Sequence, residues 1–183
     1  MRYLISISGA SGSIYGIRCV QELNKIGHEI HLIISEGAKK ILQHETSYTS
    51  DYLKTQARVV YENNDLFAGP ASGSFLLDGM VVIPCSMKTL SSIAHGFSDT
   101  LTSRVATCCL KEGKKVILVL RETPLDHAGI KNMLAAKENG AVILPAMPAF
   151  YHRPGRIEDI VDFIVGKVFD QLGLEHSLFK RWE

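Results

Sequence analysis

Small, hydroxylic and charged residues follow the apolar runs of this sequence, at the points where strands are predicted to end. The first such segment is GASGSIYG at residues 9–16, which follows the apolar run 3–8 and precedes a helical pattern. Glycines allow a tight turn and the close approach of a ligand, while a helix start offers N–H groups and a positive dipole end to an anion. The segment therefore predicts a phosphate site, with a turn needed only for chain reversal as the alternative.

The spacing of these glycines favours a mononucleotide or flavin phosphate over a dinucleotide. Gly9, Gly12 and Gly16 do not reproduce the G-x-G-x-x-G pattern of dinucleotide-binding turns. A dinucleotide site also needs an acidic residue at the end of the second strand to bind a ribose. Ser35 occupies that position, and Glu36 follows one residue later.

The segment Ser86–Thr89 combines two hydroxyl groups with the cation Lys88, again at a helix start behind a buried strand. Ser86 is predicted to cap this helix. Capping and phosphate binding are compatible, because both use the same end of the helix. We therefore expect a second phosphate-binding element here.

Arg121 and Glu122 follow a strand made of aliphatic residues. A surface ion pair is the alternative for two adjacent opposite charges, but their place at a strand end favours a functional role. A phosphate beside Glu122 would favour its protonated form, since like charges disfavour ionisation. The acid could then donate a proton.

The segment 145–154, PAMPAFYHRP, follows the last predicted strand and contains three prolines that stiffen it. Phe150 and Tyr151 could simply cover the edge of the sheet. The proximity of this segment to the other strand ends instead favours a ligand contact for Tyr151.

The composition excludes several classes of protein. The 183 residues are 46% hydrophobic with a formal net charge of +1, which is typical of one compact domain and not of a nucleic-acid-binding protein. No apolar stretch approaches the ~20 residues of a membrane span, and we expect no signal peptide before the first strand. The four cysteines form no C-x-x-C pair and the seven histidines lack ligand spacing. We therefore expect reduced, buried thiols, no metal site and a cytoplasmic location.

Apolar runs alternate with helical patterns along nearly the whole chain. The predicted strands are 3–8, 29–35, 58–62 (a short edge strand), 80–84, 115–120 and 141–144. The predicted helices are 14–25, 37–44, 89–95, 101–112, one through 132–136, and 157–172. Such alternation indicates an α/β fold, a single Rossmann-like (flavodoxin-like) domain over residues 1–183 with a parallel sheet covered by helices on both faces. The long irregular segment 63–79 is of a kind that is usually functional.

Together these motifs resemble those of the UbiX family of flavin prenyltransferases, and the resemblance covers essentially the whole chain. Its segments include GASGSIYG (9–16), HET (44–46), PASGS (70–74) and VVIPCSMKTLSSIAHG (81–96). It continues through 104–125, NML (132–134), PAMPAFYHRP (145–154) and the tail 159–182. Each segment alone is weakly specific, whereas their common order is strongly so.

The resemblance implies an enzyme that transfers a dimethylallyl group from dimethylallyl phosphate to N5 of reduced FMN and closes a second bond onto C6. The product, prenylated FMN, would be handed to a UbiD-type decarboxylase. The resemblance also implies a metal-independent reaction and a closed homo-oligomer, expected to be a homododecamer.

The resemblance further assigns residues to the site. The positions implied for FMN are Gly9, Ala10, Ser11, Ser35, Ser86, Met87, Lys88, Thr89 and Arg121. Those implied for the prenyl phosphate are Ser72, Arg104, Lys111, Glu122, Tyr151 and Lys167, with Trp182 near the site. The residues implied in catalysis are Ser11, Glu45, Lys111, Glu122 and Tyr151, with Ser11 and Glu45 near the reacting ring. Family members carry Arg or Lys at position 167, and Lys keeps the charge but loses bidentate geometry.

These residue types suit the implied reaction. Loss of phosphate leaves an allylic cation, and Arg104, Lys111 and Lys167 can stabilise the charge that develops on the leaving group. Tyr151 can donate a hydrogen bond to the same group, and aromatic faces stabilise the cation. Two alternatives are an FMN-dependent peptidyl-cysteine decarboxylase, expected to lack the three cations, and a non-catalytic flavin carrier or accessory subunit of a decarboxylase.

Overall fold

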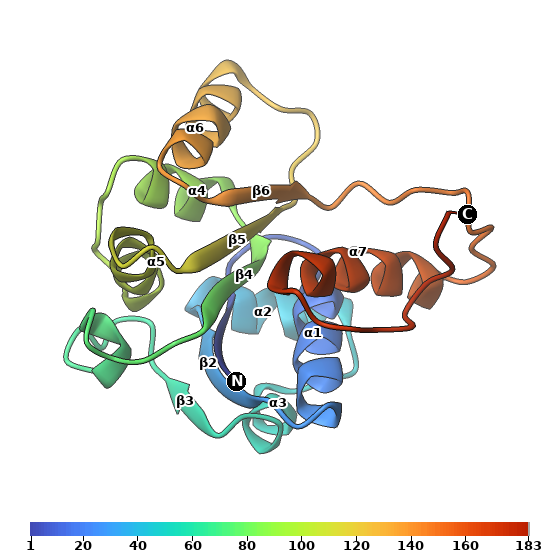
Figure 1. Cartoon of the computed structure of the whole chain (residues 1–183), viewed down its shortest axis with the longest axis horizontal. Coiled ribbons are helices and arrows are strands. Elements are labelled where there is room, and N and C mark those ends of the chain that lie inside the picture. Colours follow the sequence, from blue (N-terminus) through green and yellow to red (C-terminus); the bar gives the residue numbers. More distant parts are fainter. Residues whose placement is uncertain (183) are drawn as a thin grey trace.

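The computed structural model describes residues 1–182, and its six strands form one sheet in the order β3-β2-β1-β4-β5-β6 (Figure 1). Every neighbouring pair of strands is parallel. The strands are β1 (Arg2–Ile7), β2 (Glu29–Ile34), β3 (Val59–Tyr61), β4 (Gly79–Cys85), β5 (Lys115–Leu120) and β6 (Val142–Pro145). The predicted parallel sheet is therefore confirmed, with β3 as an edge strand.

Helices cover both faces of this sheet (Figure 1). In the described part of the chain they are α1 (Ser13–Lys25), α2 (Glu36–Glu45), α3 (Ser50–Thr55), α4 (Met87–Ala94), α5 (Leu101–Lys111), α6 (His127–Glu138) and α7 (Ile157–Leu172). One buried layer contains residues of α1, α2, α3 and α7, and the other contains residues of α4, α5 and α6. In β1, Ile5 and Ile7 face the first layer and Leu4 faces the second. Burial on both faces explains why the strand sequences are continuously apolar.

The strand order reverses between β1 and β4, and open parallel sheets bind ligands at such a point. The loops after these two strands are tied together. The Ser8 hydroxyl donates to the Pro84 carbonyl oxygen over 2.9 Å, and the Ser86 N–H donates to the Ser8 hydroxyl over 2.8 Å. The fold therefore holds the first turn against the start of α4.

All six predicted strands and all six predicted helices are present, and most of their ends differ by one or two residues. The sequence pattern does not predict α3, because this six-residue helix buries Leu53 alone and so has no apolar periodicity. A 3₁₀ turn at Gly69–Ala71 interrupts the segment 63–79 that was expected to be irregular. The predicted domain extends to Glu183, which lies outside the described residues.

All four cysteines are buried and free, as the sequence predicts. Burial raises the pKa of Cys19 to about 12 and that of Cys109 to about 11, so both thiols stay protonated. Within residues 1–182, no group of three or more His, Cys, Asp or Glu side chains could hold a metal ion. Over the same residues, no helix has the length and apolar character needed to cross a membrane.

Candidate active site

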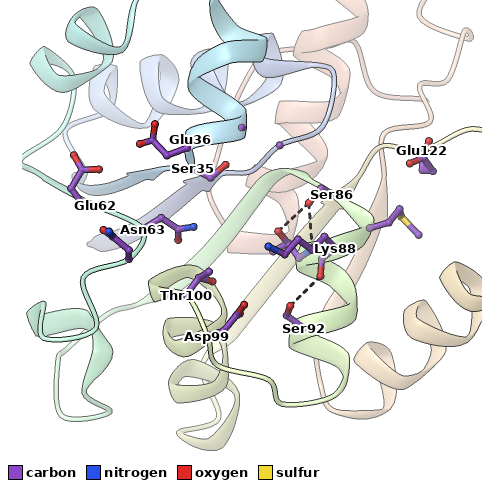
Figure 2. A pocket seen from close by; sticks show the side chains of 15 residues that line it. Ser35, Glu36, Glu62, Asn63, Ser86, Lys88, Ser92, Asp99, Thr100 and Glu122 are labelled. Carbon is purple, nitrogen blue, oxygen red and sulfur yellow. Dashed lines mark hydrogen bonds between the residues drawn. The ribbon is translucent and has the colours of Figure 1, made fainter.

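A cavity of about 700 Å³ opens where β1, β2 and β4 end (Figure 2). Part of its lining comes from the first turn, the start of α2 and helix α4, namely Gly9, Ser35, Glu36, Gly37, Ser86, Met87, Lys88, Thr89 and Ser92. From other loops it is lined by Glu62, Asn63, Asn64, Asp99, Thr100 and Glu122. Six of the nine positions implied for FMN therefore meet in one cavity.

The start of α4 forms one wall of this cavity. Ser86 is the N-cap, and its hydroxyl accepts the Thr89 N–H over 3.3 Å. The N–H groups of Met87 and Lys88 belong to the first helical turn and so have no acceptor within the helix. The side chains of Ser86 and Lys88 lie together at the cavity (Figure 2). Two backbone donors, a hydroxyl and an ammonium group can bind a phosphate here.

The start of α2 faces the same cavity. Ser35 caps this helix by accepting the Ala38 N–H over 3.2 Å. The first turn and this helix approach closely, since a Cβ on Gly37 would lie 3.5 Å from the Gly9 Cα atom. Two helix starts therefore converge on one crevice, and they belong to α2 and α4.

The start of α1 is already occupied by a carboxylate of the protein. One oxygen of Glu45 accepts the N–H groups of Gly12 over 2.8 Å and of Ser13 over 3.1 Å. Burial raises the pKa of this carboxyl, but hydrogen bonds from the Ser11 hydroxyl and the two N–H groups lower it, and the balance lies below the ordinary value. Two donors that the first turn was predicted to offer to a phosphate are therefore occupied by Glu45. No local signal could reveal this, because Glu45 comes from the far end of α2.

Arg121 lies on the other side of the first turn. A Cβ on Gly12 would be 3.9 Å from Arg121 Cγ, and the arginine charge helps to lower the pKa of Glu45. The Nε atom of Arg121 is buried and has no hydrogen-bond partner within residues 1–182. Buried donors nearly always have an acceptor, so this N–H is free to donate to a ligand at the site.

Glu122 points to the cavity from the end of β5 (Figure 2). Its carboxylate accepts the N–H of the neighbouring Thr123 over 3.2 Å. In the described part of the chain it forms no ion pair with Arg121, so the alternative of a surface ion pair between the two is wrong.

The remaining predicted residues form two further groups, and neither lines the cavity. In the first group, Arg104 Nε donates to the Ala71 carbonyl oxygen over 2.9 Å, beside Ser72. Lys111 lies close to the same loop, because a Cβ on Gly73 would be 3.1 Å from its Cε atom. This group joins α5 to the segment 69–74.

The second group lies at α7 and the C-terminal tail. The rings of Tyr151 and Trp182 meet edge to face with centroids 5.5 Å apart. Lys167 donates to Asp170 over 2.9 Å. In one copy of the chain, the residues implied for the prenyl phosphate are therefore divided among three places: the cavity, the start of the segment 69–74 with α5, and the tail.

Sequence reasoning missed the outer wall of the cavity. Glu62, Asn63, Asn64, Asp99 and Thr100 come from loops without any recognisable spacing. The long irregular segment that begins at residue 63 was the sequence feature that could have indicated this wall. Asn63 fixes its own position there, since its Oδ1 atom accepts the N–H and hydroxyl of Thr102 over 3.1 and 2.7 Å.

Comparisons with known proteins show the family to which the chain is related. The sequence matches the Flavoprotein family over residues 1–169. The flavin prenyltransferase UbiX of Thauera aromatica is 48% identical over 182 residues, which cover 100% of this chain and 94% of that protein. The crystal structure of AnUbiX (PadA1) in complex with FMN and dimethylallyl pyrophosphate is 42% identical, with a TM-score of 0.98 over 100% of this chain and 97% of that one. A dodecameric FMN-dependent UbiX-like decarboxylase from Escherichia coli O157:H7 is also 42% identical, with a TM-score of 0.97 and 100% of both chains covered.

Proposed function

The chain belongs to the UbiX family of flavin prenyltransferases, and on that premise we propose that it transfers a dimethylallyl group from dimethylallyl phosphate to reduced FMN. The observation that carries the proposal is the cavity on which the starts of α2 and α4 converge, with Lys88 and Glu122 in its lining. The related AnUbiX structure, with FMN and dimethylallyl pyrophosphate bound, supports a site that takes FMN together with a phosphorylated dimethylallyl group. A peptidyl-cysteine decarboxylase is not supported, because the family is that of the prenyltransferases.

The residues of the cavity fit FMN. The start of α4, with Lys88 and Thr89, would bind the phosphate through backbone N–H groups and charge. Ser35 and Gly9 would line the path from there to the first turn. Arg121 would supply its unpaired N–H to the flavin beside Ala10 and Ser11. When bound and reduced, FMN supplies the nucleophilic nitrogen of the reaction.

Glu45 and Ser11 are proposed to act near the reacting ring. Glu45 is held by Gly12 and Ser13 and stays ionised. A fixed carboxylate can hold or take up a proton at a defined place without any movement of the chain. The Ser11 hydroxyl, which donates to Glu45, can relay that proton.

The departing phosphate is proposed to be stabilised by Arg104, Lys111 and Lys167, with Tyr151 as a hydrogen-bond donor and Glu122 as the acid. In one copy these side chains lie in separate groups. We propose that neighbouring copies bring them together in a homododecamer, as the dodecameric relative from Escherichia coli supports. Light scattering at micromolar concentration should detect a large closed assembly, and a monomer would contradict it.

The product is proposed to pass to a UbiD-type decarboxylase in the cytoplasm. Four buried free cysteines are typical of a protein kept in a reducing compartment. A flavin that leaves its enzyme after reaction needs contacts that can be released, and the proposed phosphate site consists of helix starts and side chains without covalent attachment. Transfer can be tested by adding an apo-decarboxylase and measuring its activation.

The decisive experiment incubates the protein anaerobically with reduced FMN and dimethylallyl phosphate. The mass of the flavin should rise by one dimethylallyl unit, and its absorbance should change. A flavin carrier or accessory subunit would bind FMN and leave its mass unchanged. That result, in folded protein shown by titration to bind FMN, would exclude the proposed activity.

A further inference from the structure

Asp170, near the end of α7, is the shared acceptor of three side chains. Lys167 Nζ donates to it over 2.9 Å, Arg181 donates over 2.7 Å, and His176 Nε2 lies 3.1 Å away. The Asp170 side chain is 17% exposed. Burial raises the pKa of this carboxyl, but hydrogen bonds from Arg181, Lys167 and His176 lower it, leaving it far below its ordinary value. Asp170 is therefore a charged link between α7 and the tail that follows it.

The tail, defined here as residues 174–182, rests directly on the backbone of α7. A Cβ on Gly166 would lie 2.5 Å from Phe179 Cε1 and 2.7 Å from His176 Cε1. Phe179 also packs against Phe163, with ring centroids 4.8 Å apart. The tail therefore packs on α7 next to Lys167.

The tail brings the single tryptophan of the chain to the loop between β6 and α7. Trp182 contacts Tyr151 at an interplanar angle of 85°. The C-terminal end lies beside this loop in Figure 1. Trp182 is 77% exposed and Tyr151 is 40% exposed. Both rings therefore keep a face that can contact a ligand or a second copy.

We propose that Asp170 is a positioning residue for the prenyl-phosphate site, because its carboxylate holds the tail on α7, sets Trp182 against Tyr151 and aligns Lys167. The proposal rests on the proposed function, in which Lys167 and Tyr151 contact the prenyl phosphate and Trp182 lies near them. Asp170 itself does not contact the substrate in this scheme. It acts through the side chains that it holds.

Charge supports this role. Two cations within a few ångström repel each other, and a carboxylate between them offsets the repulsion. Lys167 and Arg181 share Asp170 in this way, so their combined charge remains positive. An arriving phosphate meets cations that are already ordered, which reduces the entropy cost of binding. Without Asp170, the phosphate would have to order both cations and the tail.

The position of the tail can be measured without substrate, because Trp182 is the single tryptophan. In full-length protein freed of flavin, the time-resolved fluorescence anisotropy of Trp182 should follow rotation of the whole assembly. Asp170→Asn should add a fast component from a released segment. In protein supplied with reduced FMN, this variant should raise KM for dimethylallyl phosphate about tenfold, with a smaller change in kcat and FMN affinity within about twofold.

Asp162→Asn is the matched control on the same helix. Asp162 accepts hydrogen bonds from Arg18 over 2.6 and 3.1 Å, and its side chain is 19% exposed. Like Asp170→Asn, this variant therefore breaks an ion pair between an arginine and a partly buried carboxylate. Asp162 borders the same groove as His176, Ser177 and Leu178 of the tail, but among the described residues it forms no hydrogen bond with them. The variant should lower stability but leave the anisotropy of Trp182 and the KM unchanged.

Gly166→Ala tests the same contact without removing a charge. The added methyl group should lift Phe179 from α7 and reproduce both effects of Asp170→Asn. The proposal is overturned if Asp170→Asn leaves the anisotropy unchanged, or if release of the tail in either variant leaves KM unchanged. Wild-type protein that binds FMN but transfers no prenyl group would instead overturn the proposed function, and the anisotropy would still decide whether Asp170 holds the tail.

Discussion

Glu45 and Arg121 carry opposite charges beside the first turn, yet their hydrogen bonds are satisfied to different degrees. Glu45 accepts two backbone N–H groups, whereas Arg121 Nε has no acceptor among the described residues. An external anion at the start of α1 would have to displace Glu45 from its donors. A ligand that offers an acceptor to Arg121 would displace nothing. Because Glu45 occupies donors at the start of α1, we assign the phosphate of FMN to the start of α4.

Glu45→Gln should lower the free energy of unfolding by an amount that depends on pH, because it removes a charge from the start of α1. Although burial raises the pKa of Glu45, its hydrogen bonds keep it below the ordinary 4.5. A lowered carboxyl pKa stabilises the fold above the unfolded-state value, and this contribution is lost as pH falls through the folded-state value. The difference in unfolding free energy from wild type should be about 0.5 kcal/mol near neutral pH, the usual value for an exposed carboxylate at a helix start. Urea denaturation should show it shrinking in acid, and an equal difference at low pH would contradict this.

Glu122→Gln should show whether Glu122 acts by donating a proton or only by its shape and hydrogen bonding. The amide keeps the shape and a hydrogen-bond donor but cannot transfer a proton. Prenyl transfer should fall by about 10²–10⁴, the usual contribution of a general acid. FMN affinity should hardly change, because its phosphate is assigned to α4. Full turnover with reduced FMN under anaerobic conditions would show that Glu122 is not the acid.

Lys111→Ala provides the contrast to that variant. It removes a positive charge that is proposed to act on the phosphate both before and during bond cleavage. It should therefore raise KM for dimethylallyl phosphate and also lower kcat, whereas loss of the acid lowers kcat alone. Steady-state kinetics on the two variants should separate these effects. Identical patterns would mean that the two residues do not have different roles.

At the scale of elements, Gly16 lets α1 pack closely on the sheet. A Cβ at this position would lie 2.5 Å from the Ile83 carbonyl oxygen and 2.9 Å from the Ile7 side chain. Since α1 also packs on α7, the position of the helix is fixed on both sides. The first turn and its hold on Glu45 depend on that placement.

Gly16→Ala should therefore destabilise the fold by about 2 kcal/mol, as expected when a methyl group is forced into a packed interior. Gly155→Ala is the control, since its Cβ would meet a single atom at 3.9 Å. Denaturant unfolding of both variants measures the difference. Equal stability would show that α1 can shift without cost.

The helices and strands could largely be predicted from the sequence, whereas the side chain that occupies the start of α1 could not. Apolar runs such as Lys115–Leu120 read as strands because both of their faces are buried. The capping role of Ser86 also followed from its place before a helix. The residue that occupies the start of α1 could not be predicted, because the packing of α2 on α1 brings Glu45 there. Asp170 gave no signal either, since its partners lie on a tail without periodicity.

At the scale of the whole molecule, the three groups of predicted phosphate residues need an explanation. The group with Lys111 lies on α5, in the layer opposite α7, which carries Lys167. The sheet thus separates these helices within one copy. A site that uses both lysines must therefore draw them from different copies, which a closed oligomer with repeated interfaces can do.

Mixed assemblies should test this arrangement. Lys111→Ala and Lys167→Ala proteins should each have low activity, because each lacks one cation at every site. When the two variants are co-expressed in equal amounts, random assembly should restore roughly a quarter of the sites, since each lysine of a site then has an even chance of being intact if the two come from different copies. If both lysines of a site came from one copy, no site would be restored. The measurement is the prenyl transfer rate per subunit of the purified mixed oligomer, compared with separately expressed variants mixed afterwards.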